Sequence, residues 1–537
     1  MIHPLLTVQG MDIAFTERVC ADIGFELHRG EWLGLVGESG SGKSLTCRGL
    51  IGLLPEGAQV TGQMTYGDRV FDLSNPQAPA RLRGVEIAMI FQDPMSALDP
   101  LMTVEGHLKL RGRADGADLL RQVGLPDGEN LLKSFPHQLS GGQCQRVALA
   151  CALARHPKIL IADEPTTALD VTVQAGILRK LRQLTDKQGM SVLFVTHDLG
   201  VVSEHCDRVM VMNAGRIVER GTAQDVLRAP KAGYTQNLLR AIPTPATRGR
   251  RLMSATPSEG EMSAASLRQP AEVALSLKHI RVTYQRPNGQ RVNAVDGVSL
   301  SLRSGEILGL VGESGSGKST VAKTAVGLVH ADGGSVELAG RPVDWHRPQA
   351  EWRRAVQYIF QDPLGAMDPL SRILDQVRTP LDIHDIGQRR DRAVMAGKRL
   401  AEARLDPALH RKKPRMLSGG QRQRATIARA LALSPKVLIC DESVSALDVS
   451  VRAHILDLLM DLRAQTGVAI LFISHDLSVI HHLCDRVAVM RGGRIVEEGD
   501  TAEVFATPQH DYTRALLAAI PKMPERDIGT LLQGESA

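Results

Sequence analysis

The chain has 537 residues, of which 43% are apolar and 23% are charged, and its formal net charge is +5. These values are typical of an ordinary soluble globular protein, and so modest a charge does not indicate nucleic acid as the main partner. Aromatic residues make up only 3% of the chain, too few for a surface that stacks single-stranded bases.

Seven cysteines are spread along the chain without a C-x-x-C pair, and several lie inside apolar runs. We therefore expect small buried thiols in a reducing compartment. No apolar run approaches the roughly 18 residues that a membrane-spanning helix needs, and we expect no secretory signal at the start of the chain. The sequence predicts a cytosolic chain, or one held at a membrane by its partners.

The first informative motif is Gly-Glu-Ser-Gly-Ser-Gly-Lys-Ser at residues 37–44, which follows a short apolar run at residues 32–36. The same eight letters return at residues 312–319, after a similar run at residues 307–311. A buried strand, a glycine loop and a helix in this order form the context of a phosphate-binding loop. A tight turn without a ligand is the alternative for one match, but two identical matches predict that the chain binds a nucleoside triphosphate twice.

In such a loop, converging backbone N–H groups and the positive end of a helix hold the phosphates. We expect Lys43 and Lys318 to reach the β- and γ-phosphates, and Ser44 and Ser319 to bind Mg²⁺. The other loop residues expected to contact the nucleotide are Gly37, Gly40, Gly42, Gly312, Gly315, Gly317 and Thr320.

Other motifs repeat in the same order behind each loop. Phe-Gln-Asp-Pro begins at Phe91 and again at Phe360, and Leu-Ser-Gly-Gly-Gln begins at Leu139 and again at Leu417. The repeats predict two copies of one domain. The expected boundaries are residues 1–243 and 273–521 for the two copies, 244–272 for a flexible linker rich in helix breakers, and 522–537 for a loosely ordered tail.

Within each copy, continuous apolar runs alternate with helical stretches, as at residues 159–162, 192–195 and 209–212. This pattern predicts an α/β fold around a parallel sheet buried on both faces. An antiparallel β subdomain is expected before about residues 75 and 345, and an inserted helical subdomain at about residues 93–138 and 362–416.

Two acidic residues follow a predicted strand in each copy. Asp163 and Asp441 end their strands and could polarise a water bound to Mg²⁺. Glu164 and Glu442 come next and could deprotonate the water that attacks the γ-phosphate. Adjacent carboxylates can also simply cap a turn, but a glycine loop in the same domain favours catalysis.

His197 and His475 each follow a further strand, where an imidazole could contact the γ-phosphate. Gln92 and Gln361 could touch both the Mg²⁺ shell and a neighbouring segment, and so couple hydrolysis to movement. A lone histidine or glutamine is more often structural, and only the repetition in matching context favours these functional assignments.

The Leu-Ser-Gly-Gly-Gln motif precedes a helical run and predicts a second anion site at a helix N-terminus. One copy cannot easily place two phosphate grips around one triphosphate, whereas two copies paired head to tail can. The residues of this second grip are Ser140, Gly141, Gly142, Gln143, Ser418, Gly419, Gly420 and Gln421.

Taken together, these motifs resemble the nucleotide-binding cassette of ABC ATPases, over nearly the whole chain and twice. The resemblance implies two P-loop NTPase domains with RecA-like cores, paired head to tail, with ATP and Mg²⁺ held at two composite sites. Each composite site would join the phosphate loop, Gln, Asp, Glu and His of one copy to the Ser-Gly-Gly-Gln of the other.

By the same resemblance, Phe15 and Tyr284 would stack on adenine, although a role as core aromatics is an alternative. Ala168-Leu169-Asp170 and Ala446-Leu447-Asp448 resemble the loop that contacts the opposite copy. The copies differ at Cys144 against Arg422, and at Pro165-Thr166 against Ser443-Val444. These differences could make the two sites unequal in rate, but both are expected to be competent.

The segments after each Phe-Gln-Asp-Pro, and the Tyr-Thr tails at residues 233–243 and 511–521, resemble the oligopeptide, dipeptide and nickel importer ATPases. That branch implies ATP-driven uptake of a peptide-like or chelated-metal solute. Its partners would be two transmembrane permease subunits and an extracytoplasmic solute-binding protein, at the cytoplasmic face of the inner membrane. Because no cysteine follows either tail closely, we expect no iron–sulfur cluster.

The rival class is a soluble tandem-cassette translation factor that acts on ribosomes. Such factors carry a long, charged helical segment between the cassettes. The segment at residues 244–272 is short and rich in helix-breaking residues. A DNA-repair ATPase would bring zinc-binding cysteines and coiled-coil heptads, which the sequence lacks.

Overall fold

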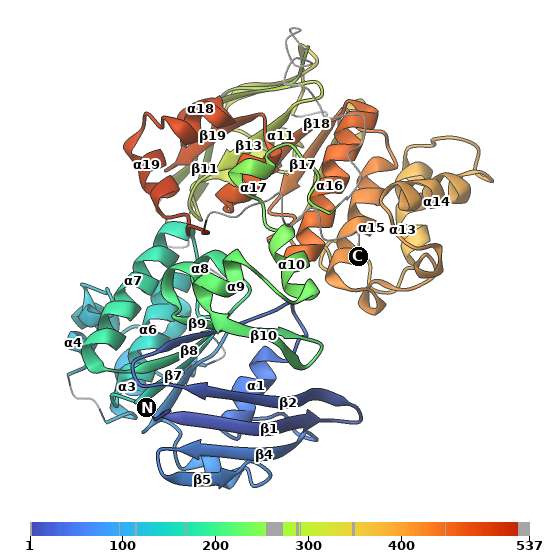
Figure 1. Cartoon of the computed structure of the whole chain (residues 1–537). Helices are drawn as coiled ribbons and strands as arrows, with labels where there is room; N and C mark the ends of the chain where they lie inside the picture. Colours follow the sequence, from blue (N-terminus) through green and yellow to red (C-terminus); the bar gives the residue numbers. More distant parts are fainter. Residues whose placement is uncertain are drawn as a thin grey trace. The chain divides into compact units, whose positions relative to one another are not determined.

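The computed structural model describes residues 3–95, 97–112, 115–166, 169–253, 272–285, 289, 291–345, 350–445 and 447–524. The chain divides into two compact units, Met1–Leu239 together with the described residues from Pro521, and Arg240–Ile520 (Figure 1). Each unit contains one glycine loop and the motifs that follow it, so each is described by itself.

The first unit is built on a mixed sheet in the order β10-β9-β3-β8-β7-β6, in which β10 alone runs antiparallel. Its strands are β3 (Trp32–Val36), β6 (Ile87–Ile90), β7 (Ile159–Asp163), β8 (Ser191–Thr196), β9 (Arg208–Asn213) and β10 (Arg216–Thr222). Since β3 lies between β8 and β9, with β7 beyond β8, the loops that follow β3, β7 and β8 emerge at one edge. This edge brings residues from distant parts of the sequence together.

A second, antiparallel sheet in the order β2-β1-β4-β5 covers α1 (Lys43–Leu50), which contacts β1, β2 and β7 (Figure 1). Apolar side chains of both sheets and of α1 form one buried core cluster. The strands of this sheet are β1 (Leu6–Ala14), β2 (Arg18–Leu27), β4 (Gln59–Tyr66) and β5 (Arg69–Asp72).

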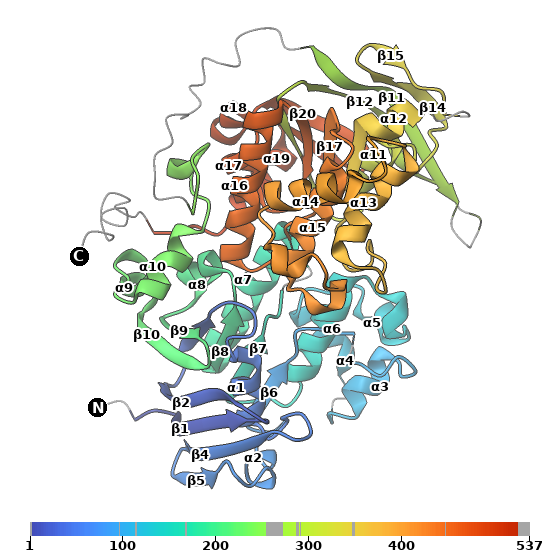
Figure 2. The same cartoon turned by 90° about the vertical axis from the view of Figure 1, so that its right-hand side faces the viewer.

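Helices α3 to α6 gather at one side of the first unit (Figure 2). The remaining helical segments surround the core sheet or follow β5 and β10. The helical segments of the first unit, α1 apart, are α2 (Gln77–Ala80), α3 (Val104–Lys109), α4 (Gly116–Gln122), α5 (Gly128–Leu132), η1 (Pro136–Gln138), α6 (Gly141–Leu153), α7 (Val171–Gln188), α8 (Leu199–His205), α9 (Ala223–Arg228) and α10 (Gly233–Arg240).

The second unit repeats this architecture, with a mixed sheet in the order β16-β17-β18-β13-β19-β20 and an antiparallel sheet in the order β12-β11-β14-β15. Its strands are β11 (Val273–Gln285), β12 (Arg291–Arg303), β13 (Ile307–Val311), β14 (Gly333–Leu338), β15 (Arg341–Pro342), β16 (Val356–Ile359), β17 (Val437–Asp441), β18 (Ala469–Ile473), β19 (Arg486–Arg491) and β20 (Arg494–Asp500). Its helical segments are η2 (Pro245–Thr247), α11 (Lys318–Ala325), α12 (Ala350–Ala355), α13 (Ile373–Ile383), α14 (Arg392–Glu402), η4 (Pro407–Leu409), η5 (Pro414–Met416), α15 (Gly419–Leu431), α16 (Val449–Thr466), α17 (Leu477–Leu483), α18 (Thr501–Ala506) and α19 (Asp511–Ala518).

The predicted α/β class, with an antiparallel β subdomain and a helical subdomain in each copy, is confirmed. The continuous apolar runs became strands buried along their whole length, because helices and the second sheet cover both faces. All seven cysteines are buried and free, as expected for small apolar side chains. Among the described residues, the structure contains no helix with the length and apolarity that crossing a membrane requires.

The start of the predicted linker differs from the prediction. Leu252 and Met253 donate their backbone N–H groups to the two oxygens of Asp457 on α16, at 2.9 and 3.0 Å. Arg251 pairs with Asp461 one helical turn later, and the Leu252 side chain is buried. A flexible linker is therefore wrong for residues 249–253, because α16 and α17 bind the backbone of Gly249, Leu252 and Met253. Residues 254–271, and the predicted tail from residue 525, lie outside the described residues.

The anchored segment covers His482 on α17, whose carbonyl oxygen accepts the Gly249 N–H at 3.0 Å. The His482 side chain is 1% exposed, and its burial lowers its pKa from 6.5 to about 4. Between these values the unfolded chain binds a proton that the folded chain excludes. The free energy of unfolding should therefore fall as the pH falls through this window.

We expect this histidine alone to cost the second unit about 2 kcal/mol of stability at pH 5 relative to pH 7. His482→Leu removes the titrating ring, so the pH dependence of unfolding should weaken by that amount. Urea unfolding at both pH values, followed by hydrogen exchange of second-unit peptides, measures the difference. His330→Leu, at an exposed histidine, is the matched control. Equal pH dependence in the parent and His482→Leu would contradict the assignment.

Candidate nucleotide site

The loop between β3 and α1 folds around the amine of Lys43. Lys43 Nζ donates to the carbonyl oxygens of Gly37 and Glu38, both at 2.8 Å, and its side chain is buried. In the second unit, Lys318 Nζ donates to the same two positions of its own loop at 2.7 and 2.8 Å. Each loop therefore holds its lysine ammonium against two of its own carbonyl oxygens, close to where the lysine of a phosphate-binding loop meets the phosphates.

The last glycine of each loop has a backbone that other residues rarely adopt. Gly42 and Gly317 have φ angles of 103° and 106°, directly before α1 and α11. A Cβ on Gly42 would lie 2.6 Å from Cys20 Sγ, and one on Gly317 would lie 2.2 Å from the Ala294 carbonyl oxygen. The close approach of β2 and β12 to the loops thus explains the glycine at this position.

A serine and an aspartate meet beside each loop. Ser44 Oγ donates to Asp163 Oδ1 at 2.9 Å, and Ser319 Oγ donates to Asp441 Oδ1 at 3.1 Å. Asp163 is fully buried, and this burial raises the pKa of its carboxyl group. Its Oδ2 has no hydrogen-bond partner among the described residues. A hydroxyl and a carboxylate with a buried, unshared oxygen fit Mg²⁺, which prefers oxygen ligands.

The two aspartates differ in one respect that the sequence motifs do not reveal. The Tyr358 hydroxyl on β16 donates to Asp441 Oδ2, whereas the same position on β6 is Met89. Burial raises the pKa of the Tyr358 hydroxyl far above its usual range, so the group stays protonated and remains a donor. The carboxylate of the second unit is therefore held at both oxygens.

Tyr358→Phe should lower the stability of the second unit by about 1–3 kcal/mol without nucleotide, because Asp441 Oδ2 then loses its donor. Met89→Phe alters the same position of the first unit without removing a hydrogen bond and is the matched control. Urea unfolding resolved by hydrogen exchange measures both variants. An unchanged unfolding midpoint for second-unit peptides in Tyr358→Phe would refute a stabilising role of the hydroxyl.

In each unit two predicted site residues, a glutamine and a histidine, approach the carboxylate of a third, a glutamate. Gln92 Nε2 donates to Glu164 Oε2 at 3.1 Å, and His197 Nδ1 lies 3.4 Å from Glu164 Oε1. In the second unit the corresponding distances, from Gln361 and His475 to Glu442, are 2.8 and 3.7 Å. The structure thus brings together residues from the ends of three different strands, twice.

Both glutamates adopt a left-handed backbone, with φ of 46° at Glu164 and 47° at Glu442. Their N–H groups donate to the Val195 and Ile473 carbonyl oxygens at 2.9 and 3.0 Å, across to the neighbouring strands β8 and β18. Such a backbone costs about 1–3 kcal/mol in a residue with a side chain and is typical of functional sites.

In the second unit, His475 and Glu442 stabilise each other's charged forms. The pairing with Glu442, at 3.7 Å, raises the pKa of His475, and the same pairing lowers the pKa of Glu442. The glutamate therefore remains ionised at neutral pH, which is the state a general base needs.

The Leu-Ser-Gly-Gly-Gln motifs begin helices α6 and α15, as predicted. Ser140 Oγ accepts the Gln143 N–H at 3.3 Å, and Gln143 Oε1 accepts the Ser140 N–H at 2.9 Å. Ser418 and Gln421 form the same reciprocal cap at 3.3 and 3.0 Å. Each motif therefore presents a hydroxyl and a positive helix end.

The residue after each motif makes a different contact. Arg422 donates to the Leu417 carbonyl oxygen at 2.6 Å, at the start of its own motif, whereas Cys144 Sγ lies 3.3 Å from the Pro136 carbonyl oxygen. The second motif is therefore braced by its arginine, and the first is not.

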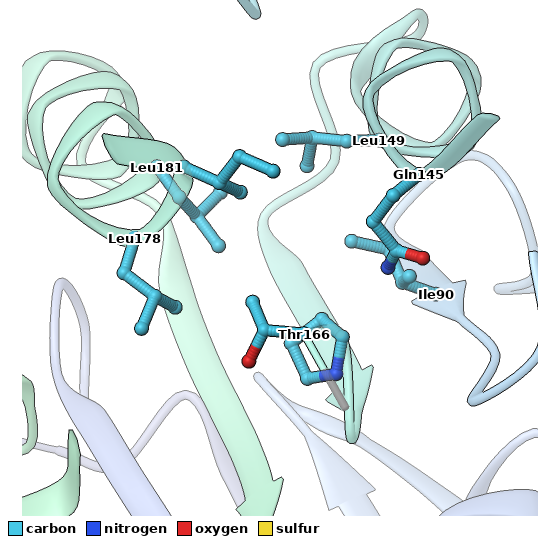
Figure 3. A pocket seen from close by; sticks show the side chains of 8 residues that line it. Ile90, Gln145, Leu149, Thr166, Leu178 and Leu181 are labelled. Carbon is cyan, nitrogen blue, oxygen red and sulfur yellow. The ribbon is translucent and has the colours of Figure 1, made fainter. Parts of the chain in front are cut away.

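The second difference expected from the sequence, Pro165-Thr166 against Ser443-Val444, lies in the interior of the first unit. Thr166 and Pro165 line a cavity of about 10 Å³ together with Gln145 of α6 and apolar side chains of α7 (Figure 3). Figure 3 shows Leu178 and Leu181 of α7 opposite Leu149 of α6 across this space. A cavity of this size holds a single water at most, so this difference concerns packing.

The remaining predicted residues lie at the surface or outside the described residues. Phe15 and Tyr284 are 36% and 45% exposed, which does not fit the alternative of core aromatics. Asp170 and Asp448 are the N-cap residues of α7 and α16. Ala168 and Ala446, which complete these predicted loops, lie outside the described residues.

Tyr358 was missed by the sequence analysis. A comparison of the two copies could have found it, because a tyrosine faces a methionine three positions before the paired glutamines. The geometry that both units share, without this hydroxyl, defines a nucleotide-binding cassette of the P-loop class, present twice in one chain.

Comparison with known proteins places this class in a family. The "ABC transporter" model matches residues 20–167 and 295–445. The "Oligopeptide/dipeptide transporter, C-terminal region" model matches residues 218–266 and 496–537.

Several relatives match along nearly the whole chain. A peptidoglycan transport ATP-binding protein, YejF, from Agrobacterium fabrum is 42% identical, covering 96% of both chains. A glutathione import ATP-binding protein, GsiA, from Escherichia coli is 42% identical, covering 96% of this chain and 89% of its own. A solved bacterial ABC transporter cassette is 29% identical, with a TM-score of 0.39, over 42% of this chain and 98% of its own.

The chain belongs to the ABC transporter family, in the branch with the oligopeptide/dipeptide-type C-terminal region. It is the ATP-hydrolysing subunit of an importer, as the sequence resemblance predicted, and the ribosomal alternative is not supported.

Proposed function

We propose that this chain drives the uptake of peptide-like solutes by hydrolysing MgATP at two sites, one built on each phosphate loop. In each site the loop lysine holds the β- and γ-phosphates, Glu164 or Glu442 accepts a proton from the attacking water, and His197 or His475 contacts the γ-phosphate. Gln92 and Gln361 link the reacting centre to the segment that follows them. Phe15 and Tyr284 offer exposed rings for the adenine.

One observation carries this proposal. In both units a glutamine and a histidine from different strands lie within 3.7 Å of the same strained glutamate. A chance cluster would not repeat with the same three residue types, the same atoms and the same left-handed backbone. A glutamate held in this way can orient a water for in-line attack.

Mg²⁺ would be held by Ser44 and Asp163 in the first site and by Ser319 and Asp441 in the second. When bound there, the ion would offset negative charge on the phosphates. The serine–aspartate hydrogen bonds, at 2.9 and 3.1 Å, already place these oxygens together. Gln92 and Gln361 would complete the shell.

The Ser-Gly-Gly-Gln helix ends would act on the opposite nucleotide, with the cassettes paired head to tail in the ATP-bound state. Each cassette contains one phosphate loop and one Ser-Gly-Gly-Gln helix end. A triphosphate enclosed from both sides would contact the loop of one cassette and the helix end of the other. In this arrangement residues 418–421 complete the first site and residues 140–143 complete the second.

A peptide-like solute is favoured by the family match of both tails and by the names of two relatives. One relative is named for glutathione import and the other for peptidoglycan transport, and both compounds contain amide-linked amino acids. The solute itself would be selected by an extracytoplasmic binding protein and by the permease.

Two transmembrane permease subunits would dock on the segments that follow Gln92 and Gln361, at the cytoplasmic face of the inner membrane. These segments expose matching leucines, with Leu101 87% and Leu370 75% exposed. Met95 and Leu364 in the same segments are 43% and 38% exposed. Equivalent apolar side chains exposed in both cassettes favour two similar protein partners.

The test is extraction of membranes with mild detergent, followed by mass spectrometry of proteins that co-purify with the tagged chain. We expect two multi-spanning subunits with the parent chain, and their loss from a Leu101→Asp/Leu370→Asp variant that still binds ATP. Leu110→Asp/Leu328→Asp, at leucines 67% and 58% exposed elsewhere, is the matched control. Ribosomal proteins without any permease would contradict the proposal.

A further inference from the structure

The tyrosine of each Tyr-Thr tail contacts the phosphate loop of its own cassette. The Glu38 N–H, in the first loop, donates to the Tyr234 hydroxyl oxygen at 3.2 Å. The Glu313 N–H, in the second loop, donates to the Tyr512 hydroxyl oxygen at 2.9 Å. The two residues of each pair are 196 and 199 positions apart in the sequence.

The start of each tail is fixed to the core sheet by a glutamate. Glu219 on β10 accepts the backbone N–H groups of Lys231 and Ala232 at 2.7 and 3.1 Å. In the second unit, Glu497 on β20 makes the same pair of bonds at 2.8 and 3.0 Å. These bonds fix the starts of helices α10 and α19. Each tyrosine near the start of its helix is therefore held close to the phosphate loop.

The tyrosine and the loop lysine hold opposite sides of one residue. The N–H of Glu38 donates to Tyr234, while its carbonyl oxygen accepts from Lys43 Nζ at 2.8 Å. Glu313 is held in the same way by Tyr512 and Lys318. The orientation of Glu38 or Glu313 therefore helps to fix the position of the lysine amine before nucleotide binds.

In the second cassette an arginine also packs against the tail tyrosine. Tyr512 is 5% exposed, and the guanidinium of Arg491 lies 4.8 Å above its ring. The first cassette has Asn213 at the position of Arg491 on the corresponding strand. A cation over an aromatic face adds stabilisation, so the contact should contribute more in the second cassette.

We propose that Tyr234 and Tyr512 are positioning residues for ATP binding, through which each tail sets the nucleotide affinity of its own cassette. The inference rests on the proposed ATP sites and assigns the tail a role there. A loop already fixed in its binding geometry loses less entropy when the nucleotide arrives, so affinity rises. The tyrosine does not touch the reacting atoms, so turnover at saturating ATP should hardly depend on it.

The test is removal of each hydroxyl by Tyr234→Phe and Tyr512→Phe, with two readouts. Backbone hydrogen exchange in peptides that contain Glu38 or Glu313 should rise only in the cassette whose tyrosine is changed. The KM for ATP should rise by about threefold to tenfold, more for Tyr512→Phe, while kcat stays within about twofold. The two loop peptides differ in their flanking residues, so each exchange rate is assigned separately.

Tyr66→Phe is the control, because it removes a tyrosine hydroxyl that donates to Glu86 at 2.8 Å, away from the loop. It should leave loop exchange and KM unchanged. Loop exchange that stays at the parental rate in both tail variants would overturn the inference, as would a loss of kcat without a change in KM. Lys43→Ala and Lys318→Ala separate the two proposals. Normal ATP binding when both lysines are changed would mean that the proposed ATP sites are wrong. If the lysine variants lose ATP binding but the tyrosine variants change neither loop exchange nor KM, only the tail inference fails.

Discussion

Replacing both Glu164 and Glu442 with Gln is expected to reduce ATP turnover by at least about a hundredfold while both sites retain ATP. Glutamine preserves the size of the side chain but cannot accept the proton of the attacking water. In the first unit, Gln92 and His197 lie 3.1 and 3.4 Å from the Glu164 carboxylate. The substitution therefore alters a group whose neighbours are other residues of the proposed reacting centre. Steady-state phosphate release and equilibrium ATP binding measure the two effects.

The matched control is Glu129→Gln/Glu351→Gln, which makes the same chemical change at two exposed glutamates. It should hydrolyse ATP at the parental rate. Turnover of the Glu164→Gln/Glu442→Gln variant at close to the parental rate would mean that these carboxylates do not serve as bases. Each single variant should keep part of the turnover, because each cassette has a complete trio.

The Lys43→Ala/Lys318→Ala variant should bind ATP about a hundredfold more weakly, because each site loses a charged donor to the phosphates. Both amines are buried, at 6% and 5% exposure, between two carbonyl oxygens of their own loop. Arginine should not restore binding, since its broad planar guanidinium does not fit between these carbonyls. Titration with labelled ATP in the presence of Mg²⁺ measures the affinity.

Lys323→Ala, at a half-buried lysine of α11 beyond the loop, is the control and should bind ATP normally. Parental affinity in Lys43→Ala/Lys318→Ala would show that the glycine loops hold no triphosphate. A loss of binding in only one of the single variants, Lys43→Ala or Lys318→Ala, would assign binding to that cassette alone.

Local features of the fold could be predicted from the sequence. The apolar runs that became β3, β7, β8 and β9 are continuous because both faces of the sheet are covered, and this leaves a clear pattern. The serine caps of α6 and α15 were also predictable, because a cap depends on residues three positions apart.

Contacts between distant residues could not be predicted in this way. The bond from Glu38 to Tyr234 spans 196 positions, and no periodicity in either segment indicates it. The anchoring of Leu252 and Met253 to Asp457 was missed for the same reason, since proline, serine and arginine suggested a free linker. Composition reports local preference, whereas one buried carboxylate can fix a segment against that preference.

The differences between the cassettes gather in the second one. Tyr358 holds Asp441, Arg422 braces the second Leu-Ser-Gly-Gly-Gln motif, and Arg491 supports Tyr512. The first cassette has Met89, Cys144 and Asn213 at these places. We therefore expect the second phosphate loop to be the more rigid before nucleotide arrives, with both sites able to hydrolyse ATP.

The central claim is that one chain contains two competent ATP sites. The most direct test is to count the nucleotides retained by the Glu164→Gln/Glu442→Gln variant after incubation with MgATP and removal of free nucleotide. Two ATP molecules per chain, falling to about one when Lys43→Ala or Lys318→Ala is added, are the expected result. One ATP per chain in the Glu164→Gln/Glu442→Gln variant would contradict the account, because it would mean that one cassette is only a structural copy.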